Sequence, residues 1–169
     1  MKKSVVKTVV ALVVLFTVSA VNVNAKSLPE FLYNTYEKGG KVTSKQVCKL
    51  NPATNTYTFH LVHEYTYTND GSLLSNKTLR WNKKTNTWEN SSIITYEHDY
   101  LTNSTTLNYA EWNKKKNAFD APSQKAVYQY LGKDHLANYV QYEKEKSDSD
   151  WQIKTHFSMN NHFVSQLNK

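Results

Sequence analysis

The chain has 169 residues and a formal net charge of +7, from 21 basic and 14 acidic side chains. This length predicts one domain and is sufficient for a packed core. A single cysteine, Cys48, excludes an internal disulfide, so we interpret it as a small buried apolar residue, with an intermolecular bridge or a reactive thiol as the alternatives. Four glycines in the whole chain exclude a glycine-rich loop for phosphate.

Residues 1–25 have the pattern of a secretory signal peptide. A basic head with three lysines precedes a mostly apolar run at residues 9–20, and the small residues of Val23-Asn24-Ala25 suit a cleavage site. Cleavage after Ala20 is the alternative. The apolar run is shorter than the roughly 20 residues of a membrane span. We therefore expect an exported protein, periplasmic or extracellular, that begins at Lys26.

Removal of that segment leaves 18 basic and 14 acidic side chains, a charge of only +4. This mild charge argues against a nucleic-acid partner. The remaining chain divides into an N-terminal segment, residues 26–40, and one domain, residues 41–169. Within the N-terminal segment, residues 28–32 suit either one helical turn or a strand that covers a sheet edge.

A phrase of ten residues recurs along the domain. LRWNKKTNTW at 79–88 returns thirty-one residues later as AEWNKKKNAF at 110–119, and fainter copies lie at 48–57 and 140–151. In each copy two apolar residues two apart precede a polar tip, and an aromatic residue follows it. This is the pattern of a β-hairpin, because side chains two apart on a strand share a face. The sequence thus predicts four hairpin repeats of about 31 residues.

The strands that follow the tips are predicted to keep their aromatic residues on one common face. In the third copy Pro122 interrupts this spacing, so we expect a β-bulge or a broken strand there. The residues expected on the common face are Tyr57, Phe59, Leu61, His63, Tyr65 and Tyr67 in the first copy, Trp88, Ile94 and Tyr96 in the second, and Trp151, Ile153, Phe157 and Met159 in the fourth.

Turn residues separate the copies. Thr68-Asn69-Asp70-Gly71 is a strong hairpin signal and Leu131-Gly132-Lys133-Asp134 a moderate one, while residues 101–104 and 160–162 are weaker. The predicted fold is all-β: an antiparallel meander of about eight strands. A row of aromatic side chains cannot stay in water, so the sheet must curve strongly. A closed up-and-down barrel and a dimeric sandwich are the alternatives.

Three phrases resemble a family of small secreted proteins of Bacteroidales bacteria, catalogued as a domain of unknown function. These phrases are YTYTNDG at 65–71, LRWNKK at 79–84 and KAVYQY at 125–130. More loosely, Tyr-x-Tyr before Asn-Asp-Gly is similar to the YD-like hairpin repeats of large bacterial wall and toxin-shell proteins. The resemblance implies export, a β-hairpin fold and no assigned activity or catalytic residue.

The residues themselves argue against catalysis and metal binding. His60 and His63 lack the spacing of a zinc protease motif and are expected on opposite faces of a strand. Glu64, Glu97 and Asp99 are interpreted as charges on the wet face, opposite the aromatic residues. A hydrolase that acts on polysaccharide or peptide through an unrecognised acidic pair is the alternative function. No cofactor or metal is expected.

Binding is the function that the sequence favours, with a glycan or an envelope protein as partner. Outward tryptophans would offer rings on which sugars stack, although their repeat positions are those of core residues. Lysines at neighbouring tips would attract acidic groups, although charged tips are commonly only solubilising. The residues of this possible platform are Trp81, Trp88, Trp112, Lys83, Lys84, Lys114, Lys115 and Lys116.

Overall fold

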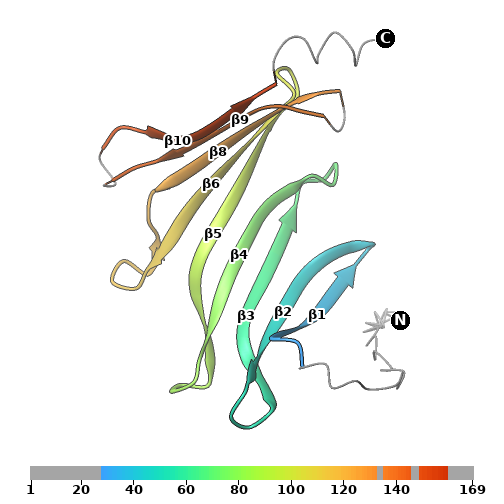
Figure 1. Ribbon diagram of the computed structural model, residues 1–169, viewed down its shortest axis with the longest axis vertical. Helices are drawn as coiled ribbons and strands as arrows, with labels where there is room; N and C mark the ends of the chain where they lie inside the picture. Colours follow the sequence, from blue (N-terminus) through green and yellow to red (C-terminus); the bar gives the residue numbers. More distant parts are fainter. Residues whose placement is uncertain (1–27, 133–134, 146–148, 160–169) are drawn as a thin grey trace, which may run out of the picture.

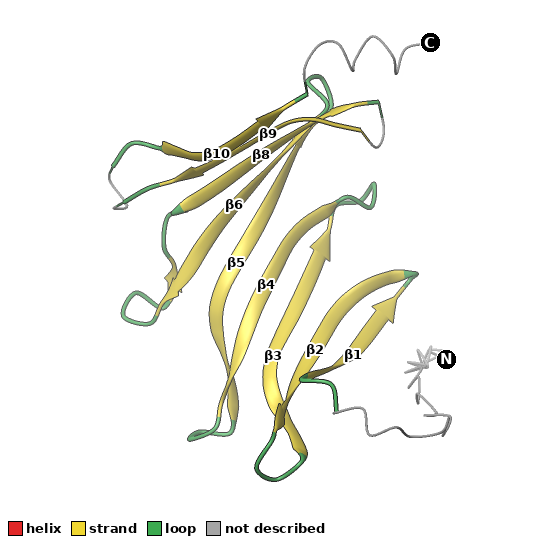
Figure 2. Cartoon of the chain, in the orientation of Figure 1, coloured by secondary structure: helices red, strands yellow, loops and turns green. Residues whose placement is uncertain are grey.

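The protein is a single antiparallel β-sheet in the computed structural model, which describes residues 28–132, 135–145 and 149–159 (Figures 1 and 2). Within this part of the chain there is no helix, and therefore no apolar helix of membrane-spanning length. The strands are β1 (Phe31–Lys38), β2 (Lys41–Asn51), β3 (Thr56–Tyr67), β4 (Leu73–Asn82), β5 (Thr87–Asp99), β6 (Ser104–Asn113), β7 (Ala118–Phe119), β8 (Gln124–Leu131), β9 (His135–Glu143) and β10 (Gln152–Ser158).

The strands pair in chain order, from β1 at one edge to β10 at the other, and the short β7 pairs with β6 beside β8. The predicted antiparallel meander is thus confirmed, with ten strands in the described part of the chain rather than eight. One added strand is β1, so the strand interpretation of the N-terminal segment is correct. The sheet is not closed, and the barrel alternative is wrong. Figure 1 shows the strong twist, which sets β8–β10 across the direction of β1–β4.

Three hairpin tips share one geometry, although only two of them share the lysine-rich phrase. The first residue of each tip is an asparagine whose Oδ1 accepts a hydrogen bond from the backbone N–H two residues on, at 2.9–3.1 Å. The last but one residue is an asparagine with φ between 50° and 52°. Asparagine tolerates this left-handed conformation and also forms such side-chain turns. The paired asparagines are Asn51 and Asn55, Asn82 and Asn86, and Asn113 and Asn117.

The opposite end of the sheet is formed by the turns that connect β1 to β2, β3 to β4 and β5 to β6, and we call it the turn end. The predicted turn at 68–71 connects β3 to β4, and Gly71 has φ 96°. Asp70 accepts hydrogen bonds from Thr68 and from the Tyr100 hydroxyl of the neighbouring turn, and these hold its pKa well below the usual range. The turn at 101–104 also connects strands as predicted, and the predicted turns at 131–134 and 160–162 include residues that lie outside the described part of the chain.

A β-bulge follows the tip in three of the four copies. Cys48 pairs with Phe59 and Val47 with Leu61, which leaves His60 as an extra residue on β3. Ser91 is extra on β5 and Lys154 on β10 in the same way. Each lies three residues after the aromatic residue of its tip. Pro122 has the same place in the third copy, where the strand breaks between β7 and β8, as predicted.

These bulges change which face of the sheet is aromatic. Paired residues share a face, whereas neighbours in a regular strand point to opposite faces. The partners of Phe59 and Leu61 are Cys48 and Val47, which are neighbours on β2. Phe59 and Leu61 therefore lie on opposite faces. The prediction of one common aromatic face is therefore wrong, because one extra residue in three of the four copies inverts the alternation. We call the side that carries Trp81, Trp88 and Trp112 the Trp face, and the side that carries Tyr65, Tyr96 and Tyr128 the Tyr face.

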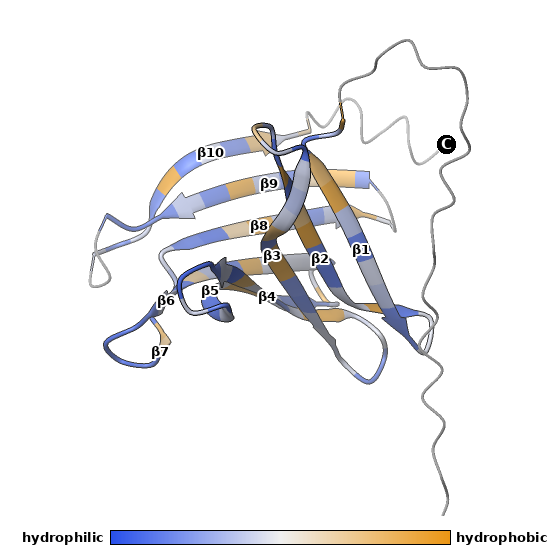
Figure 3. Ribbon diagram, turned by 90° about the horizontal axis from the view of Figure 1, so that it is seen from below, coloured by the Kyte–Doolittle hydropathy of each residue, from blue (hydrophilic) through white to orange (hydrophobic). Residues whose placement is uncertain are grey.

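In β3 to β5 the aromatic side chains thus lie on the Trp face near the tips and on the Tyr face near the turn end. In these strands neither face is therefore aromatic over its full length. The described strands form one curved layer (Figure 3), and only Val47, Ala110 and Ala137 are buried apolar residues among them. The predicted core residues Leu79, Trp81, Trp112 and Tyr142 are half-buried. Cys48 is free and also half-buried, less than predicted, and burial raises the pKa of its thiol.

Candidate functional site

A group of three contacting rings lies on the Trp face near the tips, and we call Phe59, Trp81 and Trp88 the ring cluster. The Trp81 and Trp88 rings are 5.0 Å apart, and Phe59 lies 5.1 Å from Trp81 and 5.7 Å from Trp88. Two of these contacts are edge-to-face, the arrangement that aromatic quadrupoles favour. The cluster forms because Trp81 and Trp88 are direct partners across β4 and β5, and Phe59 comes from neighbouring β3.

Solvent reaches the ring cluster. Phe59 is 45% exposed, and both tryptophans are half-buried. No other described strand covers this face, because the sheet is one layer. A second ring pair, Trp112 and Phe119 at 5.0 Å, lies on the same face across β6 and β7. The structure therefore brings all three predicted tryptophans to one face, in a cluster and an adjacent pair.

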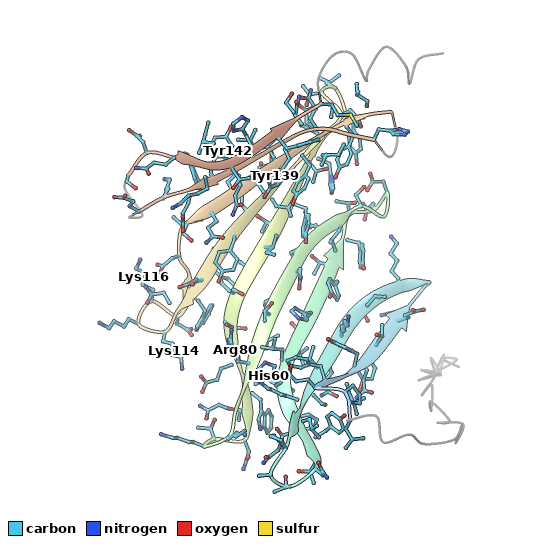
Figure 4. All side chains as sticks on the ribbon, in the orientation of Figure 1. His60, Arg80, Lys114, Lys116, Tyr139 and Tyr142 are labelled. Carbon is cyan, nitrogen blue, oxygen red and sulfur yellow. The ribbon has the colours of Figure 1, made fainter. Side chains whose placement is uncertain are left out.

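The tip lysines do not form a uniform row of free charge. Lys114 lies 2.6 Å from Glu89, and Lys116 lies 2.7 Å from Asp120. Figure 4 shows both lysines at the β6–β7 tip. Their hydrogen bonds lower the pKa values of Glu89 and Asp120, with Asn82 and Asn113 as further donors. Lys83, Lys84 and Lys115, the remaining predicted lysines, are exposed.

The Tyr face carries a second aromatic group, which was predicted to lie on the same face as the ring cluster. Tyr128 and Tyr139 have rings 4.8 Å apart, and burial raises the pKa values of Tyr65, Tyr96 and Tyr128. Two histidines border this group and bond to threonines across the strands. His63 Nδ1 is 3.1 Å from Thr78 Oγ1, and His98 Nδ1 is 3.1 Å from Thr105 Oγ1. These bonds join neighbouring strands, β3 to β4 and β5 to β6.

The histidines and carboxylates singled out in the sequence have structural partners. His60 and His63 share the Tyr face, contrary to prediction, because the bulge turns His60 toward Phe31 on β1, at 5.9 Å. Across the described ranges no three His, Cys, Asp or Glu side chains gather as a metal site. The carboxylates lie on the Trp face, not opposite the tryptophans as predicted. Glu64 pairs with Lys77, Glu97 accepts from Asn108, and Asp99 caps the turn after β5.

Comparison with known proteins places the chain. Its residues 1–130 match the sequence profile of DUF3836, described as a family of unknown function. A Bacteroides fragilis protein of unknown function has a similar fold, with a TM-score of 0.68 at 24% identity over 78% of this chain and 94% of that one. A DUF3836 protein from Parabacteroides distasonis has a TM-score of 0.54 at 28% identity, over 59% of this chain and 89% of that one. No curated protein matches the chain. The chain belongs to the DUF3836 family.

Proposed function

We propose that the chain is an exported, non-enzymatic module that binds a glycan, or else a protein partner of the envelope, through the ring cluster. The observation that carries the proposal is the exposure of Phe59, 45%, inside a three-ring cluster on a face that no described strand covers. Soluble monomers rarely leave such rings open to water without a use. A rigid sheet holds them in place, so little ordering entropy is lost when a ligand binds.

A sugar ring fits this surface better than a flat apolar partner does. Pyranose rings have an apolar face that packs on aromatic rings, while their hydroxyls need polar neighbours. Trp81 and Trp88 supply ring surface, and Asn90 lies on the same face two residues beyond Trp88. Lys83 and Lys84 begin the exposed tip that follows β4.

Other features support binding rather than hydrolysis. Glycosidases of the common type need two carboxyl groups set about 5–10 Å apart across a cleft. Glu64 is engaged by Lys77 at 2.6 Å, and Asp99 holds the backbone N–H of Leu101 at 2.9 Å. These carboxylates thus have turn and strand partners of their own. The hydrogen bonds from Thr102 and from the backbone N–H of Leu101 also lower the pKa of Asp99.

The test is a glycan array followed by calorimetry on the purified protein. A glycan that binds should lose at least about tenfold in affinity with Trp81→Ala or Trp88→Ala, because stacking on one ring contributes about 1–3 kcal/mol in comparable aromatic platforms. Trp151→Ala is the matched control, since Trp151 precedes β10 outside the cluster and should leave binding unchanged. A protein partner should show the same pattern. Binding that survives both cluster substitutions would refute the proposal.

A further inference from the structure

A group of positive charges surrounds the first bulge on the Tyr face near the tips. Lys49 on β2 pairs with Thr58, and Arg80 on β4 pairs with Leu61, so the two cations flank His60 on β3 from both neighbouring strands. The side chain of His60 lies on the same face, since its ring contacts Phe31, the partner of Lys49. Figure 4 shows His60 and Arg80 close together near the tips of β3 and β4.

The electrostatics agree with this geometry. Burial lowers the pKa of His60, and Lys49, Arg80 and Lys83 lower it further, because each opposes a positive charge on the imidazole. Lys49 and Arg80 flank His60 by strand pairing, and Lys83 lies in the tip directly after the end of β4. We call Lys49, His60, Arg80 and Lys83 the His60 cluster.

These cations are only weakly neutralised by the protein. Lys49 lies 3.4 Å from Glu30, but both side chains are about half or more exposed, and such pairs contribute little. Arg80 donates from Nε to Ser91 Oγ at 3.1 Å, which leaves the two terminal amino groups of the guanidinium without a hydrogen bond to the described residues. Glu89 is the strand partner of Arg80, but it is bound by Lys114 and Asn82. The cluster keeps an excess of positive charge.

We propose that the His60 cluster binds a phosphate monoester. A phosphate dianion matches this group better than a carboxylate does, because it can neutralise two of the three cations. The free end of Arg80 offers the planar fork that binds two phosphate oxygens, and Lys49 and Lys83 add point charges. Neutral His60 can donate or accept one further hydrogen bond. The cluster lies on the face opposite the ring cluster, so this proposal stands or falls independently of the proposed function.

The test is a titration of the purified protein with inorganic phosphate at constant ionic strength and pH 7.5, followed by NMR of the His60 ring protons. We expect a saturable shift together with a rise in the pKa of His60, because a bound anion favours the imidazolium form. Arg80→Gln should weaken the interaction about tenfold, the usual effect of losing a charge-assisted hydrogen bond. Lys115→Gln removes the same charge from a neighbouring tip and should have little effect.

Two further probes identify the source of the phosphate. Tighter binding of a hexose 6-phosphate than of inorganic phosphate would indicate a phosphorylated sugar. Binding to phosphatidylcholine vesicles that contain phosphatidic acid, lost in Arg80→Gln, would indicate a lipid headgroup. The ring-current shifts of the ring cluster report whether Arg80→Gln is folded, and Lys49→Gln replaces it if it is not. Absence of a saturable shift, or equal weakening by Lys115→Gln, would overturn the proposal.

Discussion

Replacement of Trp81 by alanine tests how much stability the ring cluster contributes. The indole lies between Phe59 and Trp88, at 5.1 and 5.0 Å, and is half-buried. A buried aromatic side chain removes about 150–250 Å² from water, and the half-buried indole is at the lower end, about 150 Å². At about 25 cal/mol per Å² this area corresponds to about 4 kcal/mol. Residual structure in the unfolded chain reduces the figure, so we expect a loss of about 3 kcal/mol in the free energy of unfolding.

The assay is urea unfolding followed by far-ultraviolet circular dichroism, since fluorescence would change with the tryptophan itself. Leu101→Ala is the control, because Leu101 is 98% exposed and should change stability by less than about 0.5 kcal/mol. A double-mutant cycle with Phe59→Leu should show a coupling of about 0.5–1.5 kcal/mol for the edge-to-face pair. A loss of under about 1 kcal/mol in Trp81→Ala would show that the rings do not pack as described.

Three further predictions address the tips, the histidines and export. Asn86 has φ 52°, so Asn86→Ala should cost about 1 kcal/mol in thermal unfolding while Asn86→Gly should be nearly neutral; equal losses would contradict the left-handed tip. Burial lowers the pKa of His63, so the unfolded chain takes up a proton first as the pH falls below 6.5. Stability should therefore decrease from pH 7 towards the lowered folded pKa, and His63→Gln should reduce that slope; an unchanged slope would refute it. Mass spectrometry of the protein exported from its host should find Lys26 as the first residue, and an intact Met1 would exclude cleavage.

Much of the fold was predictable because it depends on local patterns. The asparagines of the tips, Asn82 and Asn86, and the Asn69-Gly71 turn specify hairpins through their own side chains and backbone preferences. Hairpins in sequence order then give an antiparallel meander. The tip phrase at residues 79–88 thus predicted the two strands on either side of it and the end of the sheet at which the tip lies.

The bulges were not predictable in the same way, because an extra residue has no sequence signal of its own in an alternating strand. His60 and Ser91 are ordinary strand residues, and only Pro122 announced an interruption. The sequence signal that was missed is that each interruption lies three residues after the aromatic residue of its tip. These aromatic residues are Tyr57, Trp88, Phe119 and Trp151. Since each extra residue inverts the alternation, the faces on which the histidines and the carboxylates lie were predicted incorrectly, whereas the shared face of Trp81 and Trp88 follows from their pairing across the tip. The ion pairs of Lys114 and Lys116 also depend on contacts across strands that sequence alone does not set.

The assignment of two aromatic faces depends most directly on the pairing of β2 with β3. Nuclear Overhauser contacts between backbone protons across these strands measure that pairing residue by residue. We predict contacts that join Cys48 to Phe59 and Val47 to Leu61, with His60 left without a partner on β2. A contact that pairs Val47 with His60 would restore unbroken alternation and contradict the account.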